Sequence, residues 1–514
     1  MLCPQYLKVA NMALLWNLAL LVALSYTALN LYLFWQRRKF RHLNSLPIPL
    51  GPLWFLGIVP DINRRAKLRP LKNFPDLFSE YHQETGWDVF VIHLFIRDII
   101  FCVDLGIIAP VLTDNKTFLK TRDIHRLFAW VAGVRMFGEY GLLNDPGTEV
   151  WRAKRRIMDP AFHKNFLRTT MGGMNRVASK LIMVLESKEG TVFDVSYDLT
   201  RSAFEAIAIC GFDWDEDQIE EMSGEQEEMV KMANVIVRDL ATVFKERFIY
   251  NLPWRRREEK RYFRESVTFI RSIIRKRLQE RLDKKGPQKD DILSYIIRGN
   301  SCSDQLTIEH IVDEYLTFVG AGMETSAITM AVTIFYLMTN KDIYLKAQKE
   351  VDEVFGANEE LSFDDVNKLV YLDMVIKECL RISPPVAATG RECMKNNITI
   401  QGVHIPNGAF LFIPQNVLQN DPRYWENPDV FNPERFAPKA IAKIRPFTFM
   451  PFMAGQRSCI GKNFALLEMK IIISRMLHDF EIINPNPEVR ELVTVGNITT
   501  RPLNGVKIRV QHRV

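Results

Sequence analysis

The residues best suited to chemistry form one short loop near the C-terminus, Phe452-Met453-Ala454-Gly455-Gln456-Arg457-Ser458-Cys459-Ile460-Gly461. A cysteine that binds a metal must be deprotonated, and the N–H groups of a tight turn followed by a helix N-terminus stabilise such a thiolate. Glycines allow close approach of a flat ligand. Arg457 lies two residues before the sulfur, where its guanidinium can bind a carboxylate. We interpret the loop as a site that holds haem iron through the Cys459 thiolate and a haem propionate through Arg457.

A buried structural cysteine beside a turn is the competing interpretation, because most lone cysteines have that role. Against it, the five specified residues would occur together by chance in on the order of one chain in 10⁴; they are Phe452, Gly455, Arg457, Cys459 and Gly461. With this motif the chain resembles the cytochromes P-450, the haem-thiolate monooxygenases, from about residue 47 to the C-terminus. The resemblance implies haem b as cofactor and a mainly α fold with a small β-sheet region.

A second motif lies within a stretch of helical periodicity over residues 307–338 and reads Gly320-Ala321-Gly322-Met323-Glu324-Thr325. A glycine inside a helix costs roughly 1 kcal/mol relative to alanine, so we expect something to pass close to the backbone or the helix to open there. Alone, the stretch could equally be a helix-packing glycine pair beside a solvated glutamate. In the resembled family this acid and alcohol help to protonate bound dioxygen, which makes Glu324 and Thr325 the candidate catalytic residues.

The resemblance implies a monooxygenase that activates O2 and hydroxylates its substrate, since thiolate ligation favours O–O cleavage. It also implies NADPH electrons delivered by a flavoprotein reductase, with cytochrome b5 as a further candidate donor. Two other functions are weighed. A haem-thiolate isomerase or dehydratase would rearrange a lipid peroxide without O2 or a reductase and would have little use for Glu324 and Thr325. A non-enzymatic haem-binding protein would need neither a lipid pocket nor a proton relay.

A third set of residues joins a predicted helix to a later loop. Glu378 and Arg381 are three residues apart, which places them on one helical face, and Arg435 follows in Pro433-Glu434-Arg435-Phe436. The alternative is an exposed ion pair worth a few tenths of a kcal/mol. In the resembled family these residues brace the loop that presents the haem cysteine. We therefore expect Glu378, Arg381 and Arg435 to form a structural lock.

Further basic residues are candidates for the haem periphery. Trp151 and Arg155 are four residues apart on a predicted helix and match the family's tryptophan and arginine that contact a haem propionate. Arg391 is another propionate candidate by its position. A positive surface patch that steers an acidic reductase is expected from Lys154, Arg156, Lys462 and Lys470, with an ordinary solvated face as the alternative.

Composition is compatible with a large, helix-rich, membrane-attached enzyme but does not specify one. The chain has 514 residues, 47% of them hydrophobic, and a net charge of +6, a surplus too small to argue nucleic-acid binding. The seven cysteines are scattered and form no CxxC pair, so they suggest neither a disulfide framework nor a zinc site. No linker divides the chain after residue 60, so residues 61–514 are expected to form one catalytic domain. Periodicity predicts helices at 198–210, 225–248, 258–284, 307–338, 341–354, 368–382 and 461–478, and strands at 88–94, 99–103, 398–401 and 410–413.

The N-terminus is expected to bind a membrane. Residues 9–35 carry no charged side chain, and at ~1.5 Å per residue they exceed the roughly 30 Å of bilayer hydrocarbon. We expect a transmembrane anchor over residues 1–36, with a signal peptide as the alternative. Basic residues follow this stretch, so the positive-inside rule leaves the rest of the chain in the cytoplasm. Residues 37–60 form a basic, proline-rich hinge. As in microsomal members of the resembled family, a single-pass endoplasmic reticulum location is expected.

The resemblance also points to a lipophilic substrate. The positions that usually line the substrate pocket in the resembled family carry apolar or small residues in this chain: Phe128, Trp130, Val131, Phe137, Phe318, Ala321, Val386, Ala387, Ala388, Thr389, Val495 and Ile498. Because no charge is present to fix an anionic group, a neutral lipid such as a sterol or steroid is favoured. The C-terminal half, including residues 371–385 and 445–470, is similar to the cholesterol 24-hydroxylase branch of the family.

Overall fold

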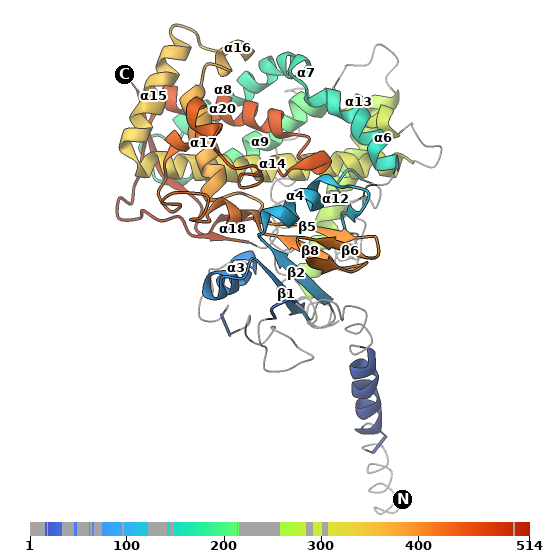
Figure 1. Cartoon of the computed structure of the whole chain (residues 1–514). Coiled ribbons are helices and arrows are strands. Elements are labelled where there is room, and N and C mark those ends of the chain that lie inside the picture. The colour runs from blue at the N-terminus through green and yellow to red at the C-terminus, as the bar shows by residue number, and fades with distance from the viewer. Residues whose placement is uncertain are drawn as a thin grey trace, which may run out of the picture.

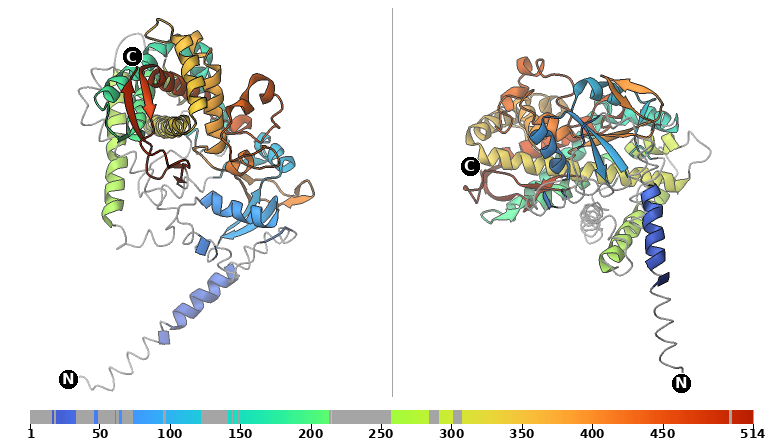
Figure 2. Two further views of the ribbon diagram at one scale, coloured as in Figure 1. Left: turned by 90° about the vertical axis from the view of Figure 1, so that its left-hand side faces the viewer. Right: turned by 60° about the horizontal axis from the view of Figure 1, so that its bottom comes forward.

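A single long helix, α14 (Ile308–Thr339), forms the centre of the fold. Apolar and small side chains follow one another along it, so most of its residues from Val312 to Leu337 are buried and it has no continuous polar face. The helices α9 (Val195–Phe212), α12 (Arg257–Asp283), α17 (Val370–Ile382) and α20 (Lys462–Asp479) pack against it. In the left view of Figure 2, α14 is seen end-on with other helices around it.

The computed structural model describes residues 16–32, 46–48, 61–65, 74–121, 141–212, 214, 257–283, 291–300, 307–496 and 499–513, apart from residues 18, 62–63, 95–96, 144, 146 and 148. The predicted helix at 225–248 and most of the hinge lie outside these residues. The other helices are α3 (Phe74–Thr85), α4 (Leu105–Thr113), α6 (Glu149–Met158), η2 (Asp159–Phe162), α7 (Lys164–Thr169), α8 (Met171–Glu186), α13 (Ile292–Asn300), α15 (Lys341–Phe355), α16 (Phe363–Val366), α18 (Gln415–Gln419), η3 (Pro433–Phe436), α19 (Pro438–Ile441) and η4 (Gly455–Arg457).

The largest sheet lies beside the helical part and has the order β1-β2-β8-β5-β3 (Figure 1). Its strands are β1 (Val89–Leu94), β2 (Arg97–Cys102), β3 (Phe118–Leu119), β5 (Thr389–Cys393) and β8 (Phe410–Ile413). β2 and β8 run parallel, with Phe101 opposite Phe412, and the other pairs are antiparallel. Smaller sheets are formed by β4 (Phe193–Asp194), β12 (Lys507–His512) and β9 (Phe480–Ile483), by β6 (Ile398–Ile400) and β7 (Val403–Ile405), and by β10 (Thr494–Val495) and β11 (Arg501–Pro502).

The expected fold class, mainly α with small sheets, is confirmed, as are the six predicted helices that fall within the described residues. The strands at 398–401 and 410–413 also form, but they do not pair with each other. β6 pairs with β7 in a separate hairpin, and β8 joins the large sheet between β2 and β5. A two-residue turn at Gln401 and Gly402, both with positive φ, closes that hairpin, so the nearest strand in sequence becomes the partner.

The N-terminal helix Ala19–Tyr32 is apolar and shorter than a membrane span. Its large side chains are exposed, with Leu21 at 66% and Leu31 at 64%, and Figure 1 draws it apart from the helices and sheets that follow. Among the described helices only α14 is long and apolar enough to cross a membrane, and α14 is the buried core helix. The anchor expected over residues 1–36 therefore remains a prediction.

Candidate functional site

The Cys459 loop lies between α4 and α20, and its backbone is tightly specified. The Cys459 N–H donates to the Phe452 carbonyl over 2.8 Å, which closes the loop. Met453 and Gly455 adopt positive φ of 62° and 75°. A Cβ at Gly455 would lie 2.2 Å from the Leu112 carbonyl oxygen of α4. Glycine is therefore required at 455 by the protein's own backbone. A Cβ at Gly461 would meet the Cys459 sulfur at an ordinary 4.0 Å, so the protein alone does not demand glycine there.

Cys459 differs from the other described cysteines in being accessible. Cys102, Cys210, Cys379 and Cys393 are buried, whereas Cys459 is exposed. Burial within the surrounding protein raises the pKa of its thiol, and the Gly461 and Lys462 backbone N–H groups, together with the positive charge of Arg155, oppose that rise. The loop thus provides part of the expected thiolate stabilisation but keeps the thiol protonated on its own. A metal cation would supply the missing positive charge.

Three cations gather at this loop: Arg391 is buried, Lys120 and Arg457 are partly buried, and the described residues form no ion pair with any of them. Burial and the charges of Arg457 and Arg391 lower the pKa of Lys120 to about 7. Burial lowers the pKa of Arg391 to about 10, and burial with the charge of Arg391 lowers that of Arg457 to about 9, although Asp145 opposes this. Arg391 Nε is buried and finds no hydrogen-bond partner among the described residues. A cluster of this kind calls for an anionic ligand.

Lys120 was missed by the sequence analysis. It follows the two-residue strand β3, and its ammonium donates to the Leu143 carbonyl. A lone lysine at the end of a short strand gives no periodic signal. Its relation to Arg391 arises from the pairing of β3 with β5, which places Leu119 opposite Glu392. Only the sheet topology brings these positions together.

Trp151 and Arg155 both face the Cys459 loop from α6. The Arg457 guanidinium lies 3.7 Å from the centre of the Trp151 ring, and both side chains donate to the Leu142 carbonyl. Arg155 pairs with Asp159 at 2.6 Å and donates to the Ser458 carbonyl over 2.9 Å. In this structure Trp151 supports Arg457 and Arg155 braces the residue before the cysteine.

The Glu324–Thr325 stretch lies in an uninterrupted part of α14. Thr325 donates its hydroxyl to the Ala321 carbonyl over 2.7 Å. The two glycines differ: a Cβ at Gly322 would approach Ile207 of α9 at 3.2 Å, whereas Gly320 borders open space. The close approach of Ile207 therefore explains the glycine at 322, whereas the helix does not open in this stretch.

Glu324 is held as a partly buried acid. Its Oε1 accepts a hydrogen bond from the Thr499 hydroxyl over 2.8 Å. Burial raises the pKa of its carboxyl to about 7, and the Thr499 hydroxyl and the charge of Arg501 oppose the rise. The side chain therefore exchanges a proton near neutral pH.

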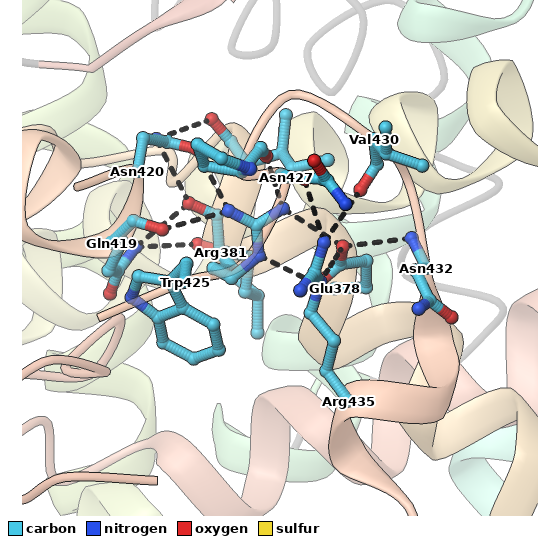
Figure 3. Close-up of polar contacts among 12 residues, drawn as sticks. Glu378, Arg381, Gln419, Asn420, Trp425, Asn427, Val430, Asn432 and Arg435 are labelled. Carbon is cyan, nitrogen blue, oxygen red and sulfur yellow. Dashed lines mark hydrogen bonds and ion pairs between the residues drawn. The ribbon is translucent and has the colours of Figure 1, made fainter. Parts of the chain in front are cut away.

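Glu378 and Arg381 form a fully buried, two-bond ion pair, with N–O distances of 2.8 and 2.9 Å. Arg435 approaches the same carboxylate at 3.3 Å, and the Asn432 N–H donates to it over 2.9 Å. Figure 3 shows Arg381 reaching on to the Gln419 carbonyl. The Gln419 side chain then accepts from the Met450 N–H over 3.0 Å. The network thus extends to the residues just before the Cys459 loop.

The predicted positive patch is wrong in part. Lys154 is 1% exposed and pairs with buried Glu314 of α14 at 3.0 Å. Lys470 pairs with Asp373 at 3.0 Å and is largely covered. Arg156 and Lys462 remain on the surface. The basic residues of α6 do not all lie on its outer face, because Lys154 is buried on the inner face with Trp151. The amino-acid sequence alone does not show which of them is buried.

The candidate pocket residues are described only in part. Phe128, Trp130, Val131, Phe137 and Ile498 lie outside the described residues. Ala387 and Phe318 are buried, with exposed fractions of 4% and 8%. Ala321 on α14 is exposed, although its neighbours Val319 and Met323 are buried. The described part of the predicted lining contributes no charge.

These features fit a haem. One accessible cysteine would provide the iron ligand, and the Lys120, Arg391 and Arg457 cluster has the charge to bind two propionates. Together the fold and site define a class of large, mainly helical proteins that enclose a haem beside a long central helix.

The sequence profile of cytochrome P450 matches residues 47–505. Cytochrome P450 4V2 of Mus musculus is 27% identical over 528 residues, covering 97% of each chain. The Homo sapiens protein of that name is 30% identical, covering 78% of each, and cytochrome P450 3A41 of Mus musculus is 27% identical, covering 72% of this chain and 76% of its own. A mutant cytochrome P450DA heme domain superposes with a TM-score of 0.77 at 23% identity, over 91% of this chain and 98% of its own.

The chain belongs to the cytochrome P450 family. It is therefore a cytochrome P450 monooxygenase that uses haem b and electrons from NADPH delivered by a reductase. The alternatives of an isomerase and of a non-enzymatic haem-binding protein are not supported.

Proposed function

We propose that Cys459 is the thiolate ligand of the haem iron and that Lys120, Arg391 and Arg457 bind the haem propionates. The observation that supports this proposal is the cluster of three cations beside the accessible Cys459, of which Arg391 is buried and Lys120 and Arg457 are partly buried. Phe452, Gly455 and Gly461 shape the loop, and Trp151 and Arg155 hold Arg457 and the Ser458 carbonyl in place. Thiolate-bound haem supplies the activation of O2.

Glu324 and Thr325 are proposed to deliver protons during that reaction. Glu324 donates a proton only in its neutral form, and its pKa of about 7 keeps it partly neutral at physiological pH. Thr325 is fixed by its bond to the Ala321 carbonyl and lies one residue away on the same helix. The buried Glu378–Arg381–Arg435 lock holds the approach to the cysteine loop rigid and is not expected to touch substrate.

The proposed substrate is a neutral lipid, with a sterol or steroid as the first candidate. The described part of the predicted lining is apolar or small, and Ala321 leaves open surface on α14. Such a lining binds by shape and apolar contact and offers no charge for an anionic group. The similarity to the cholesterol 24-hydroxylase branch favours cholesterol among the sterols to be tested.

The N-terminal segment is proposed to anchor the enzyme in the endoplasmic reticulum membrane. Residues 1–36 would form the anchor, 37–60 the hinge, and 61–514 the catalytic domain on the cytoplasmic side. A membrane-bound flavoprotein reductase and, as a second donor, cytochrome b5 would then share that surface. The exposed apolar side chains of helix Ala19–Tyr32 support this arrangement.

The first experiment is the spectrum of the dithionite-reduced protein under carbon monoxide, followed by titration of sterols into the ferric form. The wild type should give the thiolate-type Soret band, and Cys459→Ala should lose it. Lys120→Met should release haem faster than the surface control Lys439→Met. A sterol-induced spectral shift would support the substrate class, whereas no shift with any sterol would refute it. A well-folded wild type without the thiolate-type band would overturn the ligand assignment.

A further inference from the structure

A fully buried ion pair joins α6 to the central helix α14. The Lys154 ammonium lies 3.0 Å from Glu314 Oε1, and the two side chains are 1% and 0% exposed. Taking two charges out of water is costly, and replacing such a pair by apolar side chains is often neutral or stabilising. A contribution to stability alone therefore does not explain why these two charges are kept in the interior.

The Glu314 carboxylate has a second partner, in the segment just before α6. The Leu142 N–H donates to both carboxylate oxygens, over 3.2 Å to Oε1 and 3.0 Å to Oε2. Burial raises the pKa of the Glu314 carboxyl, and the Lys154 charge and the Leu142 N–H oppose that rise. Lys154 thus favours the ionised carboxylate, which binds a backbone N–H more strongly than a neutral carboxyl does.

The carbonyl groups of the same segment hold two of the three cations beside the Cys459 loop. The Leu142 carbonyl accepts a hydrogen bond from Arg457 over 3.2 Å, and the Asp145 carbonyl accepts another from the same guanidinium. The Leu143 carbonyl accepts from the Lys120 ammonium. The segment is therefore bound to α14 through an N–H and to Arg457 and Lys120 through its carbonyls.

We propose that Glu314 is a positioning residue for the haem propionates. Charged through its pair with Lys154, it fixes the segment from Leu142 to Asp145 on α14, and this segment fixes Arg457 and Lys120. Cations held beside the propionates favour the ferrous haem, which carries one positive charge fewer than the ferric form. This inference rests on the proposed propionate roles of Arg457 and Lys120, whereas the bond between Glu314 and Leu142 does not.

Two double variants separate the hydrogen bond to Leu142 from the ion pair. Lys154→Met with Glu314→Gln removes both charges but keeps a side-chain oxygen that can accept from the Leu142 N–H. Lys154→Met with Glu314→Leu removes both charges and the acceptor. The leucine double variant should release haem to apomyoglobin severalfold faster than the wild type and should have a lower ferric–ferrous reduction potential. The glutamine double variant should stay close to the wild type in both measurements.

The matched control lies at the preceding residue of α14. Asp313 pairs with Arg271 of α12 at 2.6 Å, and the two side chains are 1% and 9% exposed. Arg271→Met with Asp313→Leu therefore removes another buried pair from the same helix and leaves the Glu314 carboxylate in place. Its thermal midpoint is free to change, but its haem release rate and reduction potential should match those of the wild type.

Equal haem release and equal potentials in the glutamine and leucine double variants would overturn the proposal. Should the leucine double variant fail to fold, hydrogen exchange at the Leu142 amide of the wild-type holoenzyme decides the question. An amide held by Glu314 exchanges slowly, and exchange at the rate of an exposed loop would refute the bond. If Arg457→Met and Lys120→Met both leave haem release unchanged, the proposed propionate roles fail instead.

Discussion

Glu324 shows how one partly buried side chain can make stability depend on pH. Burial raises the pKa of its carboxyl from an ordinary 4.5 to about 7. The folded chain then keeps a proton that the unfolded chain releases, so this group lowers stability as pH rises from about 4.5 to about 7. We expect Glu324→Gln to exceed the wild type in free energy of unfolding by about 3 kcal/mol at about pH 8, and by less than about 1 kcal/mol at about pH 5.

Denaturant unfolding of the two proteins at both pH values measures this difference. Thr499→Ser serves as the control, since it keeps the hydroxyl that donates to Glu324. Parallel pH dependence in wild type and glutamine variant would show that Glu324 is already ionised at neutral pH.

Gly455 offers a prediction with a matched control. Gly455 and Gly402 have the same positive φ of 75°, but a Cβ at Gly455 would lie 2.2 Å from the Leu112 carbonyl oxygen and one at Gly402 meets nothing within 4 Å. Gly402→Ala should therefore lower the free energy of unfolding by about 1–2 kcal/mol, which is the cost of holding alanine in the left-handed conformation. Gly455→Ala should lose more than that and should fail to retain haem. Haem content and thermal unfolding of both variants measure the difference, and equal losses would contradict it.

Site residues that belong to a contiguous motif could be predicted from the sequence, whereas site residues outside such motifs could not. The Cys459 loop and the Glu324–Thr325 pair could be predicted because their neighbours in sequence are also their neighbours in space. Lys120 joins Arg391 only through strand pairing, and Lys154 is covered only because α14 provides Glu314 as a partner. Neither fact has a local signal.

Among the elements, the buried network between α17 and η3 should be a stability device. Glu378 and Arg381 are 0% exposed, so removing one partner leaves a buried charge. Arg381→Met should cost about 3–5 kcal/mol and should reduce haem content at growth temperature. Lys346→Met, which removes an exposed pair with Glu434 at 3.4 Å, is the control and should change stability by about 0–1 kcal/mol. Comparable losses in both variants would exclude a special role for burial.

The helices were more predictable than the strands for a physical reason. Helical hydrogen bonds are local, so the pattern in α9, α14 and α20 contains most of the information needed. Strand partners come from elsewhere in the chain: β8 pairs with β2 and β5, which lie on either side of it in the large sheet. The sequence of a four-residue strand such as Phe410–Ile413 indicates a strand but does not indicate which strands it pairs with.

For the whole molecule, the N-terminal segment and the catalytic body should be separable. The described hydrophobic clusters begin at Leu46, and the side chains of helix Ala19–Tyr32 are exposed. Deleting residues 1–36 should move the enzyme out of the membrane fraction and leave its thermal midpoint and thiolate-type Soret band unchanged. Replacing Leu21 and Leu24 by lysine in the full chain should weaken membrane retention in the same direction. A truncated protein that unfolds earlier would show that the segment packs on the body.

The cluster of Lys120, Arg391 and Arg457 has a consequence for how much enzyme a cell can accumulate. Burial and the positive charges of Arg457 and Arg391 lower the pKa of Lys120 to about 7, so in the chain without cofactor these side chains disfavour one another's charged forms, and an anionic ligand would relieve that repulsion. A ligand that binds only the folded form shifts the folding equilibrium by mass action. Chains made in excess of the haem supply should therefore spend more time unfolded and be removed by proteases. The abundance of this enzyme would then follow the availability of iron porphyrin, with no dedicated regulator.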